Sequence, residues 1–278
     1  MNNNEFNADA ASLSVDLSEA RQAVKENRFQ DALDLFEIIL ETDPDHIDSL
    51  YLVSVSSRYL KKFDESKKYI ERLLFIAPDM GRAYQELGHI HRDMGNLAKA
   101  AIHYRQACEL NPALLASWNY LYKYFVESKN KPAADHAREQ IEKLQSLPPA
   151  LLYIDQIMNE GRLGIAETQC RAFLKKNPTH TYAMSLLSEI ANRLGYFDDA
   201  EFLLEKAVEF EPNDGELRMK YAQILRKKQK FAKTMEQVNI LCDQYPDNHT
   251  YQAQKASEVM QNGGHEEAIK LLDNILEK

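Results

Sequence analysis

The sequence predicts an all-α fold in which about eight helix–turn–helix repeats stack into a solenoid. The first observation is the spacing of six prolines, which lie 34, 34, 66, 34 and 34 residues apart. The second is that a small residue stands twelve positions before each of them. A period of this kind indicates an array of helical hairpins rather than one compact domain. The prolines are Pro44, Pro78, Pro112, Pro178, Pro212 and Pro246, and the small residues are Ala32, Ser66, Ala100, Ala166, Ala200 and Thr234.

Residues 81–114 show how one repeat forms two helices. Within them, two stretches of side chains step by three and four residues, which is the spacing of one helical face. Gly95-Asn96 separates the stretches, and Asn111-Pro112 ends the second one. The chain contains only nine glycines and nine prolines, too few for a turn-rich β protein. The first stretch is Tyr84, Leu87, Gly88 and His91, and the second is Ala100, Tyr104 and Ala107.

The same phase places the other hairpins, after a polar tail at residues 1–12. Glycine is expected to close four of the turns, because a residue without a Cβ adopts the required backbone at low cost. These glycines are Gly95, Gly161, Gly195 and Gly263. The fourth hairpin has Pro132 in its turn, and a domain boundary there is the alternative to an irregular repeat. We expect hairpins at residues 13–46, 47–80, 81–114, 115–146, 147–180, 181–214, 215–248 and 249–278.

Two of the hairpins carry the residues of a known repeat signature. In the third hairpin, the series Leu87-Gly88, Gly95, Ala100, Tyr104, Ala107 and Pro112 resembles the tetratricopeptide repeat. The sixth hairpin repeats it with Leu187, Gly195, Ala200, Leu204, Ala207 and Pro212, and has Ser188 where the third has Gly88. The resemblance implies a right-handed α–α superhelix, a tetratricopeptide solenoid that covers residues 13–278.

Charge and composition disfavour several classes of partner. The formal net charge of −9 opposes binding to the phosphate backbone of nucleic acids. No segment approaches the ~20 apolar residues that cross a bilayer, and the first residues do not form a signal peptide. We therefore expect a cytoplasmic protein that binds neither nucleic acid nor membrane. Cys108, Cys170 and Cys242 lie far apart, and we expect them to be buried thiols.

No pattern of residues indicates catalysis, a cofactor or a metal. His91-Arg92-Asp93 matches the letters of a kinase catalytic loop, but no glycine-rich loop or DFG sequence accompanies it. His89 and His91 are two residues apart, which turns them to different faces of a helix and prevents them from sharing a metal. We expect this chain alone not to be an enzyme, and to have no catalytic, cofactor-binding or metal site.

The resemblance implies a concave groove that is lined by the first helix of each repeat. In units two to four the residues expected to face it can donate hydrogen bonds, and three are cationic, which suits an extended acidic or C-terminal peptide segment. In units five to seven the equivalent residues have mixed charge. For any single residue, a solvated helix surface is the alternative interpretation. The first set is Tyr51, Arg58, Gln85, His89, Arg92, Asn119 and Lys123, and the second is Asp155, Tyr182, Ser185, Glu189, Asn192, Gln223 and Arg226.

These patterns favour a scaffold that binds a protein or peptide in the groove. The alternative is the non-catalytic N-terminal arm, regulatory or substrate-presenting, of a larger enzyme that is similar to bacterial tetratricopeptide sulfotransferases. In that case the catalytic domain would follow residue 278. The last hairpin motivates this alternative, because it stops at Lys278 with an apolar second helix and no polar cap. A third hypothesis is a homodimer through this C-terminal repeat.

Overall fold

The computed structural model describes residues 17–276, and all regular secondary structure within them is α-helix. The predicted all-α fold of about eight helix–turn–helix repeats is therefore confirmed. The predicted polar tail at residues 1–12 lies outside the described residues. Within residues 17–276, no helix combines the length and the apolar character that crossing a membrane requires.

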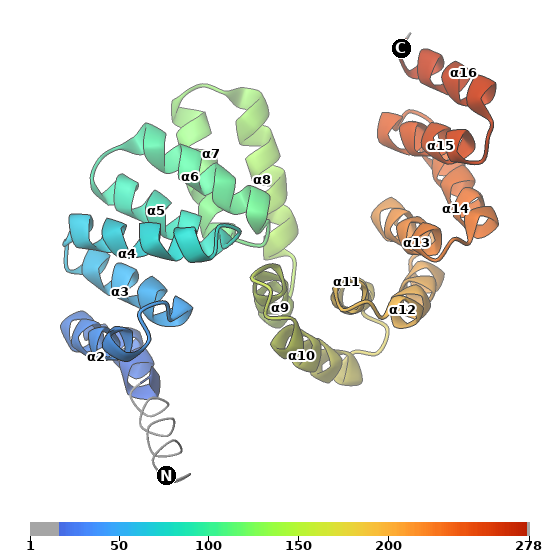
Figure 1. The fold of residues 1–278 in the computed structure, drawn as a ribbon. Helices are drawn as coiled ribbons and strands as arrows, with labels where there is room; N and C mark the ends of the chain where they lie inside the picture. The colour runs from blue at the N-terminus through green and yellow to red at the C-terminus, as the bar shows by residue number, and fades with distance from the viewer. Residues whose placement is uncertain (1–16, 277–278) are drawn as a thin grey trace. The chain divides into compact units, whose positions relative to one another are not determined.

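The helices follow one another as hairpins (Figure 1). Residues 17–25 are helical and precede α2 (Phe29–Thr42). The other pairs are α3 (Ile47–Tyr59) and α4 (Phe63–Ile76), α5 (Gly81–Asp93) and α6 (Leu97–Leu110), α7 (Leu115–Glu127) and α8 (Lys131–Gln145), α9 (Pro149–Asn159) and α10 (Leu163–Lys176), α11 (Thr181–Arg193) and α12 (Phe197–Phe210), α13 (Gly215–Lys227) and α14 (Phe231–Gln244), and α15 (His249–Gln261) and α16 (His265–Leu276). The two helices pack on each other in the hairpins α3–α4, α5–α6, α7–α8, α11–α12, α13–α14 and α15–α16. Second helices also pack on the first helix of the next hairpin, as α4 does on α5 and α12 on α13.

The chain divides into two compact units. The first contains the described residues up to Leu152 together with Asn159–Gly161. The second contains Tyr153–Met158 and the described residues from Arg162 onward. The division therefore falls within α9 and the turn that follows it, and one continuous array from residue 13 stays a prediction.

The segment around Pro132 is a hairpin turn within the first unit. Pro132 lies in the first turn of α8, where its missing N–H breaks no helical hydrogen bond. The side chain of Asn130 caps this helix by accepting a hydrogen bond from the N–H of Ala133 at 3.3 Å. Because α7 and α8 also pack on each other, the chain folds back on itself at this proline.

A left-handed backbone residue closes every hairpin at the same position of the repeat. Four of these residues are the glycines expected at the turns, with φ between 78° and 87°. The other four are not glycine, and their φ values lie between 56° and 61°. The turn is therefore fixed by backbone geometry even where the sequence lacks glycine. The glycines are Gly95, Gly161, Gly195 and Gly263, and the other residues are Asn27, Lys61, Lys129 and Gln229.

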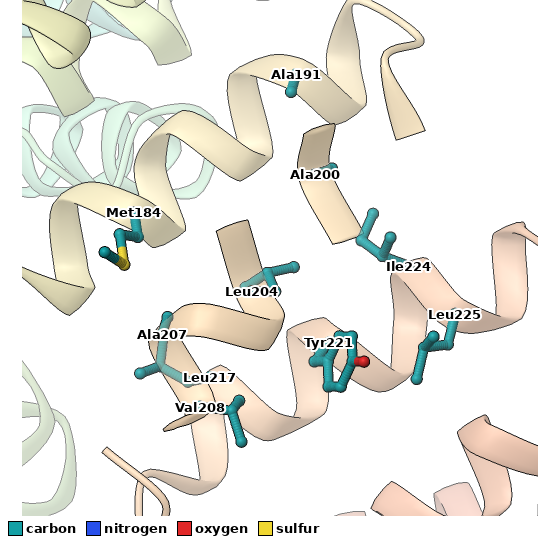
Figure 2. Close-up of a cluster of buried hydrophobic side chains, with 10 residues drawn as sticks. All are labelled: Met184, Ala191, Ala200, Leu204, Ala207, Val208, Leu217, Tyr221, Ile224 and Leu225. Carbon is teal, nitrogen blue, oxygen red and sulfur yellow. The ribbon is translucent and has the colours of Figure 1, made fainter. Parts of the chain in front are cut away.

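The small residues of the repeat lie in the interior, between packed helices. Ala32, Ser66, Ala100, Ala166, Ala200 and Thr234 are all buried, with exposed fractions of 0% or 1%. Figure 2 shows Ala200 on α12 within a cluster that also contains Leu204, Ala207 and side chains of α11 and α13. Replacing a buried alanine here by a long side chain would force the helices apart.

Gly88 explains part of the signature in the third hairpin. A Cβ at this position would lie 2.8 Å from ring atoms of Tyr104, which is buried on α6. Glycine is therefore required opposite the tyrosine. In the sixth hairpin the corresponding pair is Ser188 and Leu204, and the smaller leucine leaves room for a side chain.

Candidate binding surface

The candidate surface consists of predicted residues on the first helices of the hairpins. Where one of these helices carries several predicted residues, they are three, four or seven positions apart, so they share one face. In the first unit the predicted residues lie on three such helices. In the second unit they lie on α9, α11 and α13. The first set consists of Tyr51 and Arg58 on α3, Gln85, His89 and Arg92 on α5, and Asn119 and Lys123 on α7.

Arg58 is a buried cation. Its side chain is 8% exposed, its Nε donates to Oε1 of Glu86 at 2.5 Å, and its Nη1 donates to Oδ2 of Asp93 at 3.1 Å. Burial alone would lower the pKa of Arg58, but the two carboxylates outweigh burial and raise it. Glu86 is itself only 2% exposed. The charge of Arg58 is thus neutralised inside the protein.

His89 and Arg92 both interact within their own hairpin. His89 Nδ1 lies 2.5 Å from the hydroxyl of Tyr104. Burial, reinforced by the charges of Arg58 and Arg92, lowers the pKa of His89 to about 4, so its imidazole is neutral at pH 7. Nε and Nη2 of Arg92 donate to Oδ1 of Asp93 at 2.8 and 2.7 Å. The side chain of Arg92 is therefore 39% exposed, but its positive charge is paired with the carboxylate of Asp93.

The remaining predicted residues of the first unit differ in their hydrogen bonding and in their exposure to solvent. Gln85 Nε2 donates to the hydroxyl of Ser117 at 2.9 Å, which links α5 to α7. Asn119 Nδ2 donates to the carbonyl of Leu115 on its own helix. Lys123 is exposed and forms no hydrogen bond or ion pair with residues of the described range. Tyr51 lies against Arg82, a residue that the sequence did not indicate.

In the second unit, several predicted residues contact one another. The Tyr182 hydroxyl donates to Oδ2 of Asp155 at 2.6 Å, and burial together with this carboxylate raises the pKa of Tyr182. Asn192 Nδ2 donates to Oε2 of Glu189 at 3.2 Å. Arg226 Nη1 pairs with Oε1 of Glu258 at 3.2 Å, and Glu258 is 2% exposed. Arg226 therefore resembles Arg58, since each pairs with a buried carboxylate of the next hairpin.

A pocket of about 50 Å³ lies among α11, α12 and α13. Three predicted residues line it, namely Glu189, Asn192 and Gln223. The sequence interpretation missed its two lysines, although Lys220 and Lys227 are three and four residues from Gln223 on the same helix face. Lys220 Nζ donates to the hydroxyl of Ser185 at 2.9 Å, and Lys227 Nζ to Oδ1 of Asn192 at 2.8 Å. The complete lining is Ser188, Glu189, Asn192, Leu204, Lys220, Gln223, Ile224 and Lys227.

Of the three cations predicted to line the groove in units two to four, Lys123 alone forms no ion pair within the described residues. The sequence places the cationic face in units two to four, but Arg58 and Arg92 there are paired with carboxylates. Lys220 and Lys227 in the second unit donate hydrogen bonds to neutral oxygens and form no ion pair among the described residues. Lys227 Nζ also lies 5.9 Å from the centroid of the Phe197 ring. The pocket between α11 and α13 thus carries positive charge that a ligand could neutralise.

His91 lies on another face of α5 from His89. Its ring stacks on that of His103 of α6, with centroids 5.1 Å apart and planes within 11°. Nδ1 of each ring is buried without a hydrogen-bond partner in the described structure, and burial lowers the pKa of both histidines. Across residues 17–276, no group of three or more His, Cys, Asp or Glu side chains could hold a metal ion.

The three cysteines are free thiols. Cys108 and Cys170 are buried as predicted, and burial raises the pKa of each to about 12, so neither forms a thiolate at neutral pH. Cys242 is only partly buried, so the expectation of a buried thiol is not met at this position. Burial raises the pKa of Cys242 as well.

Comparison with solved structures finds chains that align with this one at low sequence identity. The Naa15 complex, solved as Naa15/Naa10 bound to HypK-THB, aligns at 17% identity over 89% of this chain and 39% of its own, with a TM-score of 0.44. The APC/C hetero-tetramer Cut9-Hcn1 aligns at 16% identity over 94% of this chain and 52% of its own, with a TM-score of 0.41. MamA aligns at 14% identity over 71% and 96%, with a TM-score of 0.40. This chain thus spans about two fifths of the length of the Naa15-complex chain and about half of the length of the Cut9-Hcn1 chain.

The family comparison identifies two of the hairpins directly. Residues 81–114 and 182–214 match the family model described as Tetratricopeptide repeat. These are α5–α6 and α11–α12, the hairpins in which Gly88 or Ser188 faces the second helix and a buried alanine lies at position 100 or 200. The chain therefore contains tetratricopeptide repeats, at the two hairpins whose sequences resemble that signature most fully.

Proposed function

We propose that this chain is a scaffold that binds a segment of another protein on the face formed by its first helices. The observation that carries the proposal is the pocket among α11, α12 and α13. Its polar side chains come from two consecutive repeats, and Leu204 and Ile224 supply an apolar part. An extended polypeptide leaves its main-chain N–H and C=O groups free, so a surface with both donors and acceptors complements it.

The charge of the pocket favours an acidic segment. Lys220 and Lys227 are exposed, and neither forms an ion pair within residues 17–276. The carboxylate of Glu189 is engaged by Arg193, whose Nε lies 2.8 Å from it. A carboxylate of the bound segment between the two lysines would form charge-assisted hydrogen bonds. The proposed ligand is therefore an acidic or C-terminal segment, bound in the second unit.

A photo-crosslinking experiment tests where the partner binds. A photoreactive amino acid at Gln223, which is exposed and lines the pocket, should crosslink to a partner in the source cell. The matched control places the same amino acid at Glu209 on α12, which is 56% exposed and does not line the pocket. Equal crosslinking from both positions would contradict binding on this face.

A titration with the crosslinked partner, once purified, tests the chemistry. Replacing both lysines by glutamate (K220E/K227E) should weaken binding at least about tenfold, because two attractive charges become repulsive. Lys206→Glu on α12 is the control, since Lys206 is also exposed but lies outside the pocket. Unchanged affinity of the double variant would refute the acidic segment.

Two other hypotheses stay predictions. Association with a sulfotransferase or another enzyme domain is decided by the coding sequence after residue 278. A homodimer through the C-terminal repeat would use Ile269, Leu272 and Leu276 of α16, whose side chains are exposed. Sedimentation at low concentration checks it, and a monomer there would exclude it.

A further inference from the structure

Arg82 extends the polar face of α5 toward the start of the helix. Residues 82, 85, 89 and 92 are separated by three or four positions, so Arg82 shares a face with Gln85, His89 and Arg92. Across from it on α3 is Tyr51, one of the predicted groove residues. The Cζ atom of Arg82 lies 4.8 Å from the centroid of the Tyr51 ring, which places the guanidinium against the aromatic face.

A carboxylate of the same unit already occupies this place. Glu160 belongs to the turn after α9, whose residues Asn159–Gly161 are part of the first unit. Its Oε1 lies 3.4 Å from Nε of Arg82, the distance of an ion pair. The side chain of Glu160 is only 5% exposed, whereas that of Arg82 is 37% exposed.

Burial of Glu160 indicates that the surroundings accept a negative charge. A carboxylate leaves water only where cations and hydrogen-bond donors compensate it. Arg82 supplies the cation, and contact with an aromatic ring orients its planar guanidinium. Burial also raises the pKa of Tyr51, so the phenol stays neutral at pH 7 and adds no negative charge.

We propose that Tyr51 and Arg82 form a carboxylate-binding subsite of the first unit, which Glu160 fills until a carboxylate of a polypeptide bound on the first helices of that unit replaces it. Glu160 acts as an internal competitor, so the affinity for an external carboxylate is reduced by the fraction of time that the subsite is closed. The replacement by a polypeptide rests on the proposed function. The occupancy by Glu160 does not, because it concerns this chain alone.

The test uses the full chain and acetate as the probe. The Nε–Hε signal of Arg82 is followed by NMR while acetate replaces chloride at constant ionic strength, and its loss in Arg82→Gln assigns the signal. Glu160→Gln keeps the shape of the side chain but removes its charge. We expect this variant to bind acetate at least about tenfold more tightly than the unmodified chain, as for a subsite freed from a competitor that closes it about nine tenths of the time.

The controls separate the subsite from a general charge effect. Glu142→Gln on α8 removes one negative charge from a side chain that is 70% exposed, and should leave acetate binding unchanged. Equal acetate affinity of Glu160→Gln and the unmodified chain, or tighter binding in Glu142→Gln as well, would overturn the proposal.

A second variant covers the case in which Glu160→Gln does not fold, as judged by circular dichroism. Glu160→Asp keeps the charge but is one methylene shorter, so we expect an affinity above that of the unmodified chain; no gain would count against the subsite. Failure of the lysine variants to weaken partner binding would refute the proposed function but would not change the acetate result.

Discussion

The hairpins α5–α6 and α11–α12 use the same repeat for different chemistry. Their residues correspond at an offset of 100, so Gly95 matches Gly195 and Ala100 matches Ala200. Both glycines have positive φ, and both alanines are fully buried. The positions that set the turn and the helix packing are thus the same in the two hairpins.

The residues between these positions differ in kind. Glu86 of α5 holds the buried Arg58, whereas the matching residues of the second unit are Leu186 and Met158, both buried and apolar. Carboxylates pair with Arg58 and Arg92 in the first unit, where Lys123 is unpaired within residues 17–276. In the second unit, Lys220 and Lys227 of the pocket form no ion pair within that range. The comparison teaches that the repeat fixes the backbone, while the residues between its fixed positions decide whether a charge is available to a ligand.

The largest expected effect comes from placing only one of the two apolar residues, the leucine of position 186, at the matching position 86 of the first unit. Glu86→Leu leaves Arg58 buried without its main partner and should destabilise the protein by about 3 kcal/mol. The double variant Arg58→Met/Glu86→Leu copies the second unit at these two positions and should return to within about 1 kcal/mol of the unmodified chain, because well-packed apolar residues can replace a buried ion pair. Urea unfolding followed by circular dichroism measures both. A double variant as unstable as the single one would break the correspondence.

Charge reversal on the two faces should affect partner binding unequally. Lys227→Glu removes an uncompensated cation and should weaken binding about tenfold, whereas Arg92→Glu removes one already paired with Asp93 and should weaken it about twofold. Titration calorimetry with the same partner compares the two variants. A larger loss for Arg92→Glu would assign the ligand to the first face.

A smaller difference is expected in the response to pH. His91 and His103 correspond to Ala191 and Leu203, so only the first hairpin contains the stacked imidazoles. Burial lowers the pKa of both histidines, and Lys67 and Lys99 lower it further. The pKa of His103 is also lowered by His91, and Glu71 opposes the shift at His91 only. In the unfolded chain these two histidines bind protons more readily than in the folded protein. The stability linked to their titration is therefore fully present above about pH 6.5 and is lost as the pH falls toward their pKa values in the folded protein.

Copying the second hairpin should remove this part of the acid sensitivity. His91→Ala/His103→Leu is expected to lose less stability between pH 7 and pH 5 than the unmodified chain, as measured by urea unfolding at each pH. His89 is unchanged in both proteins, so its own titration cancels in the comparison. Identical losses would show that the stacked pair does not titrate in this range.

The smallest effect concerns the turns. Lys129 adopts the left-handed backbone that Gly195 adopts at the same position of the repeat. Lys129→Gly should stabilise the protein by about 0.5 kcal/mol, because relief of the left-handed strain exceeds the entropy that glycine loses on folding. Gly195→Lys should cost a similar amount. Thermal unfolding of the two variants measures the difference, and a destabilising Lys129→Gly would contradict this account.

The sequence predicts the hairpins because their determinants are local and periodic. Pro112, Gly95 and Ala100 act within one repeat, so their spacing is sufficient to indicate the fold. The left-handed turns at Lys61, Lys129 and Gln229 have no such signal, since their residues do not favour that conformation and only the phase of the repeat points to them.

The state of the candidate site depends on partners far along the chain. Arg58 meets Glu86 from the next hairpin, and Arg82 meets Glu160 from a turn 78 residues later. Helical periodicity places an arginine on a face, but it does not say which carboxylate reaches that arginine. For this reason the helix on which each of these residues lies was predictable from the sequence, whereas the pairing of its charge was not.

The recurrence of one left-handed residue in each hairpin limits where residues can be inserted into or deleted from this chain. One added residue in the turn would rotate the second helix by about 100° and direct its small residues away from the neighbouring helix. The only irregular spacing agrees with this constraint: 34 residues separate neighbouring left-handed positions, except for 32 between Lys129 and Gly161. The two missing residues fall outside the tight turn of α7–α8. Insertions and deletions should therefore be tolerated between hairpins and rejected within them.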